Sequence, residues 1–384
     1  MSLARYRSVR HVESELTHAK LFFLASDLGA GAAAVQLALL ARGLPRERFS
    51  VAVGVLGRAE GAAADALRAA GLSVAPLPVR HPLDFSGMRK LRNAVRGANP
   101  AVLHCFGPEA VRASRLAVSG GANGGNVPRL VASAATAPGG GVSGWLTGRQ
   151  LRRADRVIAT GKAEGERYRR LGVRGERLTR IGPAVTAPAE PPDRAQFCRD
   201  VLAPVDSKLI FAGGGLDAAH GVKDAVIAFD MMRYDSPALR LVLTGDGRDR
   251  VEAEELGRAL AFDDYRVHFS GPRADLPAAA RLAEMVWVTC ARGGELLALR
   301  AMAAGRPVIA YHTPELDEVI DDGVTGYLVP AGDRTAIATK AHELLADPAL
   351  AARLGEAGRA RAAERFGVSR MVEQHARVYQ ELVG

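Results

Sequence analysis

Residues 288–333 read VTCARGGELLALRAMAAGRPVIAYHTPELDEVIDDGVTGYLVPAGD, and this stretch decides the fold class. It is expected to form a loop, a helix, a strand, a second loop, a second helix and a second strand in close succession. The apolar run 285–289 suits a buried parallel strand, and Gly293 and Gly294 form a turn after it. Residues 296–304 then have helical spacing. Such a turn leads to a helix N-terminus, which favours an anion such as phosphate; the alternative is an ordinary βα turn.

Glycine turns of the same kind occur elsewhere in the chain. In the first half, the apolar run 21–25 leads through Gly29 and Gly31 into a helical pattern at 32–42. In the second half, two more strand-like runs end in turns that carry Gly214, Gly215, Gly245 and Asp246. The alternation of strands and helices predicts parallel sheets covered on both faces, in Rossmann-like units of an α/β fold.

The length and composition indicate two domains. A chain of 384 residues with 48% hydrophobic residues can bury more than one core. A stretch rich in proline and alanine at 186–193 separates two alternating series. The expected parts, in chain order, are an N-terminal extension at 1–19, a first domain at 20–185, a linker at 186–205, a second domain at 206–365 and a C-terminal helix at 366–384.

The stretch 288–333 also carries a family resemblance. The matching residues, all in register, are Leu299, 301–305, Pro307, Val308, Glu318, Val319, 322–326, 328–330, Gly332 and Asp333. They resemble the C-terminal signature of the family-4 (group 1) retaining glycosyltransferases. The resemblance implies the GT-B fold, in which two Rossmann-like domains face a cleft, the last helix packs back on the first domain, and a nucleotide-sugar donor binds the second.

The chain departs from the family at residues that would do the chemistry. The family has two glutamates around this turn, one near the donor sugar and one on the ribose hydroxyls, and here Arg292 and Arg300 stand in their places. Arginine accepts no hydrogen bond, so it cannot replace a carboxylate, but its fork of donors suits phosphate oxygens. Arg292 is the stronger candidate, because Arg300 could be buried against a structural carboxylate.

The family's other polar contacts are also replaced. Its phosphate-binding Arg and Lys would fall at Gly215 and His220, and Lys223 is close enough in sequence to be a partial substitute. Where the family has its active-site histidine, this chain has Ala134 and Ala135. Alanine can neither orient a sugar nor hold a proton.

Two residues are candidates for catalysis. Glu295 could replace the missing carboxylates, and His104 stands where the family commonly has a histidine, although a structural role at a sheet edge is the first expectation for it. The predicted substrate-binding residues are Gly29, Gly31, Gly214, Gly215, His220, Lys223, Gly245, Asp246, Arg292, Gly293, Gly294 and Arg300. No metal or other cofactor is expected, because backbone N–H groups and arginines would hold the phosphate charge.

The net charge of +9 is concentrated in one region. Residues 149–180 hold eleven Lys or Arg against four Asp or Glu, so eleven minus four leaves an excess of seven. Trp145, Leu146 and Leu151 adjoin it and would form an amphipathic helix on a membrane surface. The alternatives, which are favoured, are a solvated arginine-rich face and apolar side chains packed into the domain. Nucleic acid is a weaker partner, because only Tyr168 is interleaved to stack a base.

The location of the protein is expected to be cytoplasmic, or peripheral on the inner face of a membrane. The three cysteines are widely spaced and odd in number, which indicates reduced thiols. Residues 1–19 lack the apolar core of a signal peptide.

Two functions remain open. One is a glycosyltransferase that moves a sugar from a nucleotide-sugar donor to a glycan, lipid or small-molecule acceptor. The other is a catalytically silent protein of the same fold, which binds a nucleotide, a glycan or a partner protein. The arginines at 292 and 300 favour the second function, and the otherwise intact turn favours the first.

Overall fold

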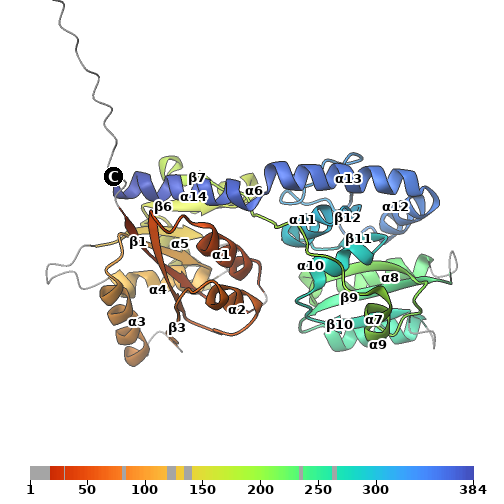
Figure 1. Cartoon of the computed structure of the whole chain (residues 1–384), viewed down its shortest axis with the longest axis horizontal. Helices are drawn as coiled ribbons and strands as arrows, with labels where there is room; N and C mark the ends of the chain where they lie inside the picture. The colour runs from red at the N-terminus through yellow and green to blue at the C-terminus, as the bar shows by residue number, and fades with distance from the viewer. Residues whose placement is uncertain are drawn as a thin grey trace, which may run out of the picture.

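The computed structural model describes residues 18–29, 31–79, 84–118, 127–133, 141–232, 237–261 and 266–384. They form two α/β domains that lie side by side, each built on one parallel sheet (Figure 1). The predicted fold class is therefore confirmed.

The first domain contains a seven-stranded sheet in the order β3-β2-β1-β4-β5-β6-β7. One face is covered by α1, α2 and the C-terminal α14, and the other by α3, α4, α5 and α6. The elements are β1 Ala19–Ala25, α1 Ala32–Gly43, β2 Phe49–Val55, α2 Ala62–Ala69, β3 Val74–Pro76, α3 Phe85–Ala98, β4 Val102–Phe106, α4 Pro108–Val118, β5 Arg129–Ser133, α5 Gly141–Leu151, β6 Arg156–Ala159, α6 Lys162–Arg170, η2 Gly175–Arg177 and β7 Leu178–Arg180.

The second domain contains a six-stranded sheet in the order β10-β9-β8-β11-β12-β13. Its elements are α7 Arg194–Asp200, β8 Lys208–Gly215, η3 Ala218–His220, α8 Val222–Met232, β9 Leu239–Asp246, α9 Arg250–Ala261, β10 Val267–Gly271, α10 Leu276–Ala279, η5 Ala280–Leu282, β11 Met285–Val288, α11 Glu295–Ala303, β12 Val308–Tyr311, β13 Tyr327–Val329, α12 Arg334–Ala346 and α13 Pro348–Arg365. The chain order reverses between β8 and β11. Open parallel sheets bind ligands at such a switch point, beyond the carboxyl ends of the strands.

The chain crosses between the domains twice, at neighbouring positions. The N–H of Val185 donates to the carbonyl of Phe366 at 2.9 Å, so the outgoing and returning segments are bonded to each other. After this crossing, α14 (Val368–Val383) runs along the first domain, end to end with α13 in Figure 1. Its Met371 and Tyr379 are buried in the core of that domain with Phe23 of β1.

Two expectations about local structure are wrong. The linker predicted at 186–205 includes α7, because Asp193 accepts a hydrogen bond from the N–H of Gln196 and Phe197 is buried in the second domain. The second helix predicted within 288–333 is also not formed. Residues 314–319 instead make a series of turns, in which Thr313 and Leu316 accept the backbone hydrogen bonds.

Candidate functional site

The turn before α11 has the glycine geometry that its sequence predicts. Gly293 and Gly294 adopt φ values of 74° and 90°, a region that side-chain-bearing residues rarely enter. A Cβ at Gly294 would also lie 2.7 Å from a methyl group of Val288. Gly294 is the N-cap of α11, and because it has no side chain it cannot cap the N–H groups of the first turn of the helix.

The turn after β8 is arranged around an aspartate and a histidine. Asp217 accepts hydrogen bonds from the N–H of Ala219 at 2.9 Å and from Nδ1 of His220 at 2.7 Å. Burial opposes ionisation of Asp217, but the hydrogen bonds from His220 and the backbone outweigh it, so the pKa of this carboxyl is lowered. The imidazole of His220 lies 2.6 Å from where a Cβ of Gly215 would be, which explains the glycine there.

The two turns are joined at the switch point. The N–H of Ala291 donates to the carbonyl of Ala219 at 2.9 Å, and Oγ1 of Thr289 donates to the carbonyl of His220 at 3.0 Å. The structure therefore brings His220 and the glycines 214, 215, 293 and 294 together.

The turn after β9 adjoins the same place. A Cβ at Gly245 would lie 1.9 Å from the carbonyl oxygen of Gly214, so this glycine allows the two backbones to approach closely. Asp246, next to it, accepts from the N–H of Gly247 at 2.9 Å. Both predicted residues thus lie beside the β8 turn.

The two arginines at the family's glutamate positions have different surroundings. Arg292 is exposed, whereas Arg300 is half-buried and its burial lowers the pKa of the guanidinium. The structural carboxylate that Arg300 was expected to meet is not found: in the described part of the chain, Arg300 makes no ion pair. The carboxylate on which the preference for Arg292 rested is therefore missing, and which of the two arginines binds phosphate stays a prediction.

Lys223, the expected partial substitute for the family's cations, is paired with a carboxylate in this structure. Its ammonium group lies 2.5 Å from a carboxylate oxygen of Glu252 on α9. The hydrogen bond with Glu252 raises the pKa of Lys223 and lowers that of Glu252. A phosphate would have to compete with this carboxylate for the lysine.

The glycine turn of the first domain is held by hydrogen bonds to the side chain of Asp27. The N–H of Gly29 donates to Oδ1 of Asp27 at 2.6 Å, and Oδ2 of Asp27 accepts from the N–H of Arg58 at 2.9 Å. A Cβ at Gly31, the N-cap of α1, would meet no atom within 4 Å. Both hydrogen bonds of Asp27 lie within the first domain.

His104 is a structural residue in the middle of the sheet. It is fully buried on β4, which lies between β1 and β5, so the expected position at a sheet edge is wrong. Its Nδ1 is 2.7 Å from the hydroxyl of Tyr379, and its Nε2 is 2.8 Å from Oγ of Ser133. Burial, followed by the nearby His375, lowers its pKa well below the usual value. Both ring nitrogens of His104 therefore have partners inside the protein, as its expected structural role requires.

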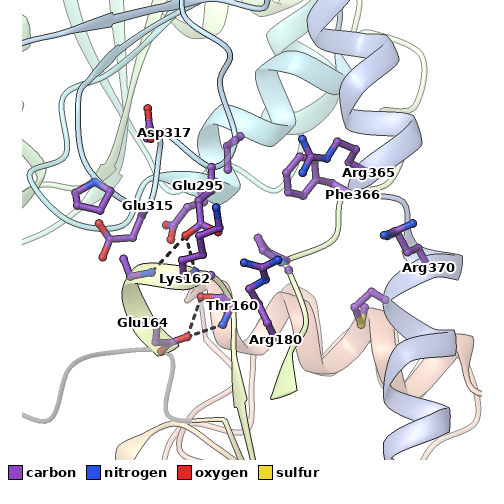
Figure 2. A pocket seen from close by; sticks show the side chains of 18 of the residues that line it. Thr160, Lys162, Glu164, Arg180, Glu295, Glu315, Asp317, Arg365, Phe366 and Arg370 are labelled. Atoms are coloured by element: carbon purple, nitrogen blue, oxygen red, sulfur yellow. Dashed lines mark hydrogen bonds between the residues drawn. The ribbon is translucent and has the colours of Figure 1, made fainter. Parts of the chain in front are cut away.

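A pocket of about 560 Å³ lies between the two domains. Figure 2 shows acidic side chains of the second domain, Glu295, Glu315 and Asp317, on one side of it, and the arginines 180, 365 and 370 on the other. Its remaining lining residues include 160–164, Glu166, Gly182, Pro183, Pro314, Glu318, Val319, Arg361, 366–367, Met371 and Gln374. The predicted cleft between the domains is therefore present.

Glu295 is the one catalytic candidate that lines this pocket. It is the first residue of α11, and burial raises the pKa of its carboxyl. Its own N–H and Arg167 favour ionisation, whereas Glu315 and Glu164 oppose it. A carboxyl held this way binds a proton more readily than an exposed glutamate does.

The loop after β12 connects the two domains directly. Oε1 of Glu318 accepts a hydrogen bond from the N–H of Lys162 at 2.6 Å, at the start of α6. Glu315 forms an ion pair with Arg167 of α6 at 2.6 Å. Glu318 belongs to the family signature, but nothing in the sequence identifies α6 as its partner, so these contacts were not predicted.

The other predicted features of the chain are as follows. Ala134 and Ala135 lie outside the described residues. Cys105, Cys198 and Cys290 are buried and unpaired. In the described part of the chain, no helix has the length and apolar character needed to cross a membrane.

Comparison with known proteins identifies both domains. The family model described as "Glycosyl transferase 4-like domain" matches residues 31–184, and "Glycosyl transferases group 1" matches residues 206–347. The two matches together include the first-domain glycine turn at Gly31 and the signature around α11.

Two curated relatives match part of the chain. The N-acetyl-alpha-D-glucosaminyl L-malate synthase of Bacillus anthracis is 31% identical over 163 residues, which are 42% of each chain. The D-inositol 3-phosphate glycosyltransferase of Salinispora tropica is 31% identical over 257 residues, which are 60% of this chain and 52% of the relative. The chain thus spans about half the length of these relatives or less.

A solved structure matches nearly the whole chain. It is the Anabaena HepE protein in complex with UDP and glucose, with a TM-score of 0.82, 21% identity, and coverage of 94% of this chain and 100% of that one. A second match is the sucrose-phosphate synthase from Thermosynechococcus elongatus, with a TM-score of 0.76 and 20% identity. The alignment covers 94% of this chain and 99% of the synthase. The two matches identify the GT-B fold.

Proposed function

Since this chain belongs to the group 1 glycosyltransferases, we propose that it transfers a sugar from a nucleotide-sugar donor to an acceptor in the cleft. The observation that carries the proposal is the position of Glu295. This half-buried carboxyl starts the helix that follows the glycine turn, and it faces a pocket lined by both domains. The switch-point turns and a proton-accepting group are therefore adjacent, as group transfer between two bound substrates requires.

The donor would bind at the switch point of the second domain. Its diphosphate would be held by the uncapped N–H groups of α11 and by Arg300, which has no counter-ion among the described residues. The structure known with UDP and glucose supports a nucleotide-sugar as the donor class. We propose no metal for the reaction, because these groups would neutralise the leaving diphosphate themselves.

The reaction would proceed with each residue in a defined role. The acceptor oxygen forms a bond to the anomeric carbon as the bond from that carbon to the diphosphate breaks. The hydroxyl proton of the acceptor passes to the carboxylate of Glu295, whose raised pKa favours this role. The nucleoside diphosphate leaves with its charge on Arg300 and the backbone N–H groups.

The acceptor would be an anionic small molecule or lipid headgroup. Arg180, Arg365 and Arg370 line the pocket opposite the acidic wall, and among the described residues none of these three forms an ion pair. The names of the two relatives contain L-malate and inositol 3-phosphate, both of which are anionic. An acceptor with a phosphate or carboxylate on one side and hydroxyls on the other would match both walls.

A donor panel tests the proposal. The protein is incubated with UDP-, GDP- and ADP-sugars, with and without anionic acceptors, and release of the nucleoside diphosphate is measured. We expect one donor to be turned over, with at least a hundredfold loss in Glu295→Gln and none in Glu255→Gln, an exposed residue on α9. Turnover that is equal in wild type and Glu295→Gln would contradict the proposed role of Glu295.

A binding protein without catalytic activity is the second candidate. It is favoured by the arginines at positions 292 and 300, where the family has glutamates. In that case calorimetry would detect binding of UDP or GDP, whereas no donor in the panel would be turned over.

A further inference from the structure

The helix α5 exposes a stripe of apolar side chains that the packing of the first domain leaves uncovered. Val142 is 75% exposed, Trp145 58% and Leu146 37%, whereas Leu151 at the end of the helix is fully buried. The spacing of three and four residues places Val142, Trp145 and Leu146 on one side of the helix. Trp145, Leu146 and Leu151 were expected to pack into the domain, and of these three only Leu151 is buried there.

Arginines continue this stripe. The guanidinium of Arg149 lies over the ring of Trp145, 5.6 Å from its centroid, and Arg153 is exposed one turn farther on. Neither arginine forms an ion pair among the described residues. Two of the three apolar side chains therefore lie within one helical turn of an unneutralised cation.

The C-terminal end of α6 extends the positive surface. Arg152 donates to the carbonyl of Leu171 at 2.8 Å, so the ends of α5 and α6 are in contact. Arg169 and Arg170 are exposed in the last turn of α6. Arg170 pairs loosely with Glu166, at 3.8 Å, and an exposed pair of this kind neutralises little of the local field. The apolar stripe thus has basic side chains along one edge and at one end.

We propose that this surface, formed by α5 and the end of α6, binds an anionic lipid bilayer. Val142, Trp145 and Leu146 would insert between the headgroups, and Arg149, Arg153 and Arg169 would contact lipid phosphates. Exposed aromatic and aliphatic side chains beside unpaired arginines are the features by which a surface helix lies in the headgroup region. A solvated face would not need the apolar stripe, and a nucleic-acid surface would need more than one aromatic side chain.

The surface is separate from the interdomain pocket. None of the six side chains named for it lines that pocket, so lipid binding does not depend on the proposed transfer reaction.

The chain provides its own spectroscopic probe. It contains two tryptophans, and Trp287 is fully buried in the second domain. A change in tryptophan emission on adding vesicles therefore reports on Trp145. Vesicles of phosphatidylcholine with 30% phosphatidylglycerol should shift the emission to shorter wavelength, and lipids brominated on the acyl chain should quench it. Pure phosphatidylcholine vesicles should do neither.

Variants separate the apolar and ionic contributions, with co-sedimentation as the readout. Trp145→Ala should reduce binding about tenfold. Each basic residue near a charged membrane strengthens binding about fivefold, so the double variant Arg149→Glu with Arg153→Glu should reduce binding at least about 25-fold. The control is Arg42→Glu with Arg353→Glu, which makes the same change in net charge at exposed sites on α1 and α13. Circular dichroism verifies that each variant is folded.

Four outcomes would overturn the proposal. The first is a failure of the wild-type protein to sediment with the anionic vesicles. Binding equally weakened by the control variant would reveal a general effect of net charge. Binding without a change in Trp145 emission, or stronger binding to RNA or heparin than to vesicles, would assign the surface to another polyanion.

Discussion

The carboxylate of Glu318 lies 2.6 Å from the backbone nitrogen of Lys162, across the boundary between the two domains. A residue of the second domain thus caps a helix of the first, and a Cβ at Gly161 would lie only 2.6 Å from the same oxygen. The contact can exist only while the domains are in this relative position.

Removal of this cap should loosen the domains. Glu318→Ala deletes the acceptor at the N-terminus of α6, and loss of an N-cap costs about 1 kcal/mol. We expect a lower Tm and a larger radius of gyration by small-angle X-ray scattering. Glu318→Gln keeps an acceptor oxygen and should show a smaller effect. An unchanged scattering profile for both variants would mean that the remaining contacts, such as Arg167 with Glu315, hold the domains without Glu318.

Nucleotide binding should depend on Arg300 more than on Arg292. A hydrogen bond to a charged group contributes about 1.5–3 kcal/mol, so Arg300→Met should weaken binding of UDP or GDP by roughly 10- to 150-fold. Arg292→Met should change the Kd by less than about twofold, because exposed charges contribute little. Calorimetric titration measures both variants, and a larger loss for Arg292→Met would reverse the assignment.

The ionised form of Glu295 should lower the free energy of unfolding at neutral pH. Burial raises the pKa of its carboxyl, so the folded state holds the proton more tightly than the unfolded chain does. The resulting stabilisation is present below the ordinary pKa of glutamate and is lost as pH rises through the raised value. Glu295→Gln should therefore have a higher Tm than wild type at pH 7.5, and the difference should shrink towards pH 4. A lower Tm for the variant at pH 7.5 would contradict this account.

Two buried histidines should make the protein sensitive to acid. Burial lowers the pKa of His375 to about 4, and burial and His375 lower that of His104 as well. The unfolded chain therefore binds more protons than the folded one below about pH 6.5, so stability should fall as pH decreases from 6.5 towards 4. Denaturant unfolding at several pH values should show a smaller decrease in His375→Gln. The control, His312→Gln at an exposed position, should retain the full decrease.

The fold was predictable because its signals are local. The apolar runs that become β1, β8 and β11 are each followed within a few residues by glycine and then by a helical pattern, and this order alone indicates parallel sheets. The glycines at 293 and 294 also revealed their role, since their positive φ values match the turn that the strand and helix require.

The site was predictable only in part because its contacts are long-range. Arg167 and Glu315 are 148 residues apart in sequence, and Glu318 meets Lys162 across 156 residues. No periodicity or spacing within either segment identifies such partners. The surroundings of Arg300 were unpredictable for the same reason: whether a half-buried arginine has a counter-ion depends on which other elements pack beside it.

The C-terminal helix has a consequence for the order of events during synthesis. Tyr379 completes the core of the domain that begins with β1, and its hydroxyl satisfies His104 of the central strand. Until residues 368–383 have left the ribosome, the first domain therefore has an uncovered apolar groove, in which His104 lacks the hydroxyl of Tyr379. The segment that closes this groove, Val368–Val383, follows the whole second domain in the chain. The core of the first domain thus cannot be completed before the second domain has been synthesised, and its uncovered groove is open to chaperones and proteases during that interval.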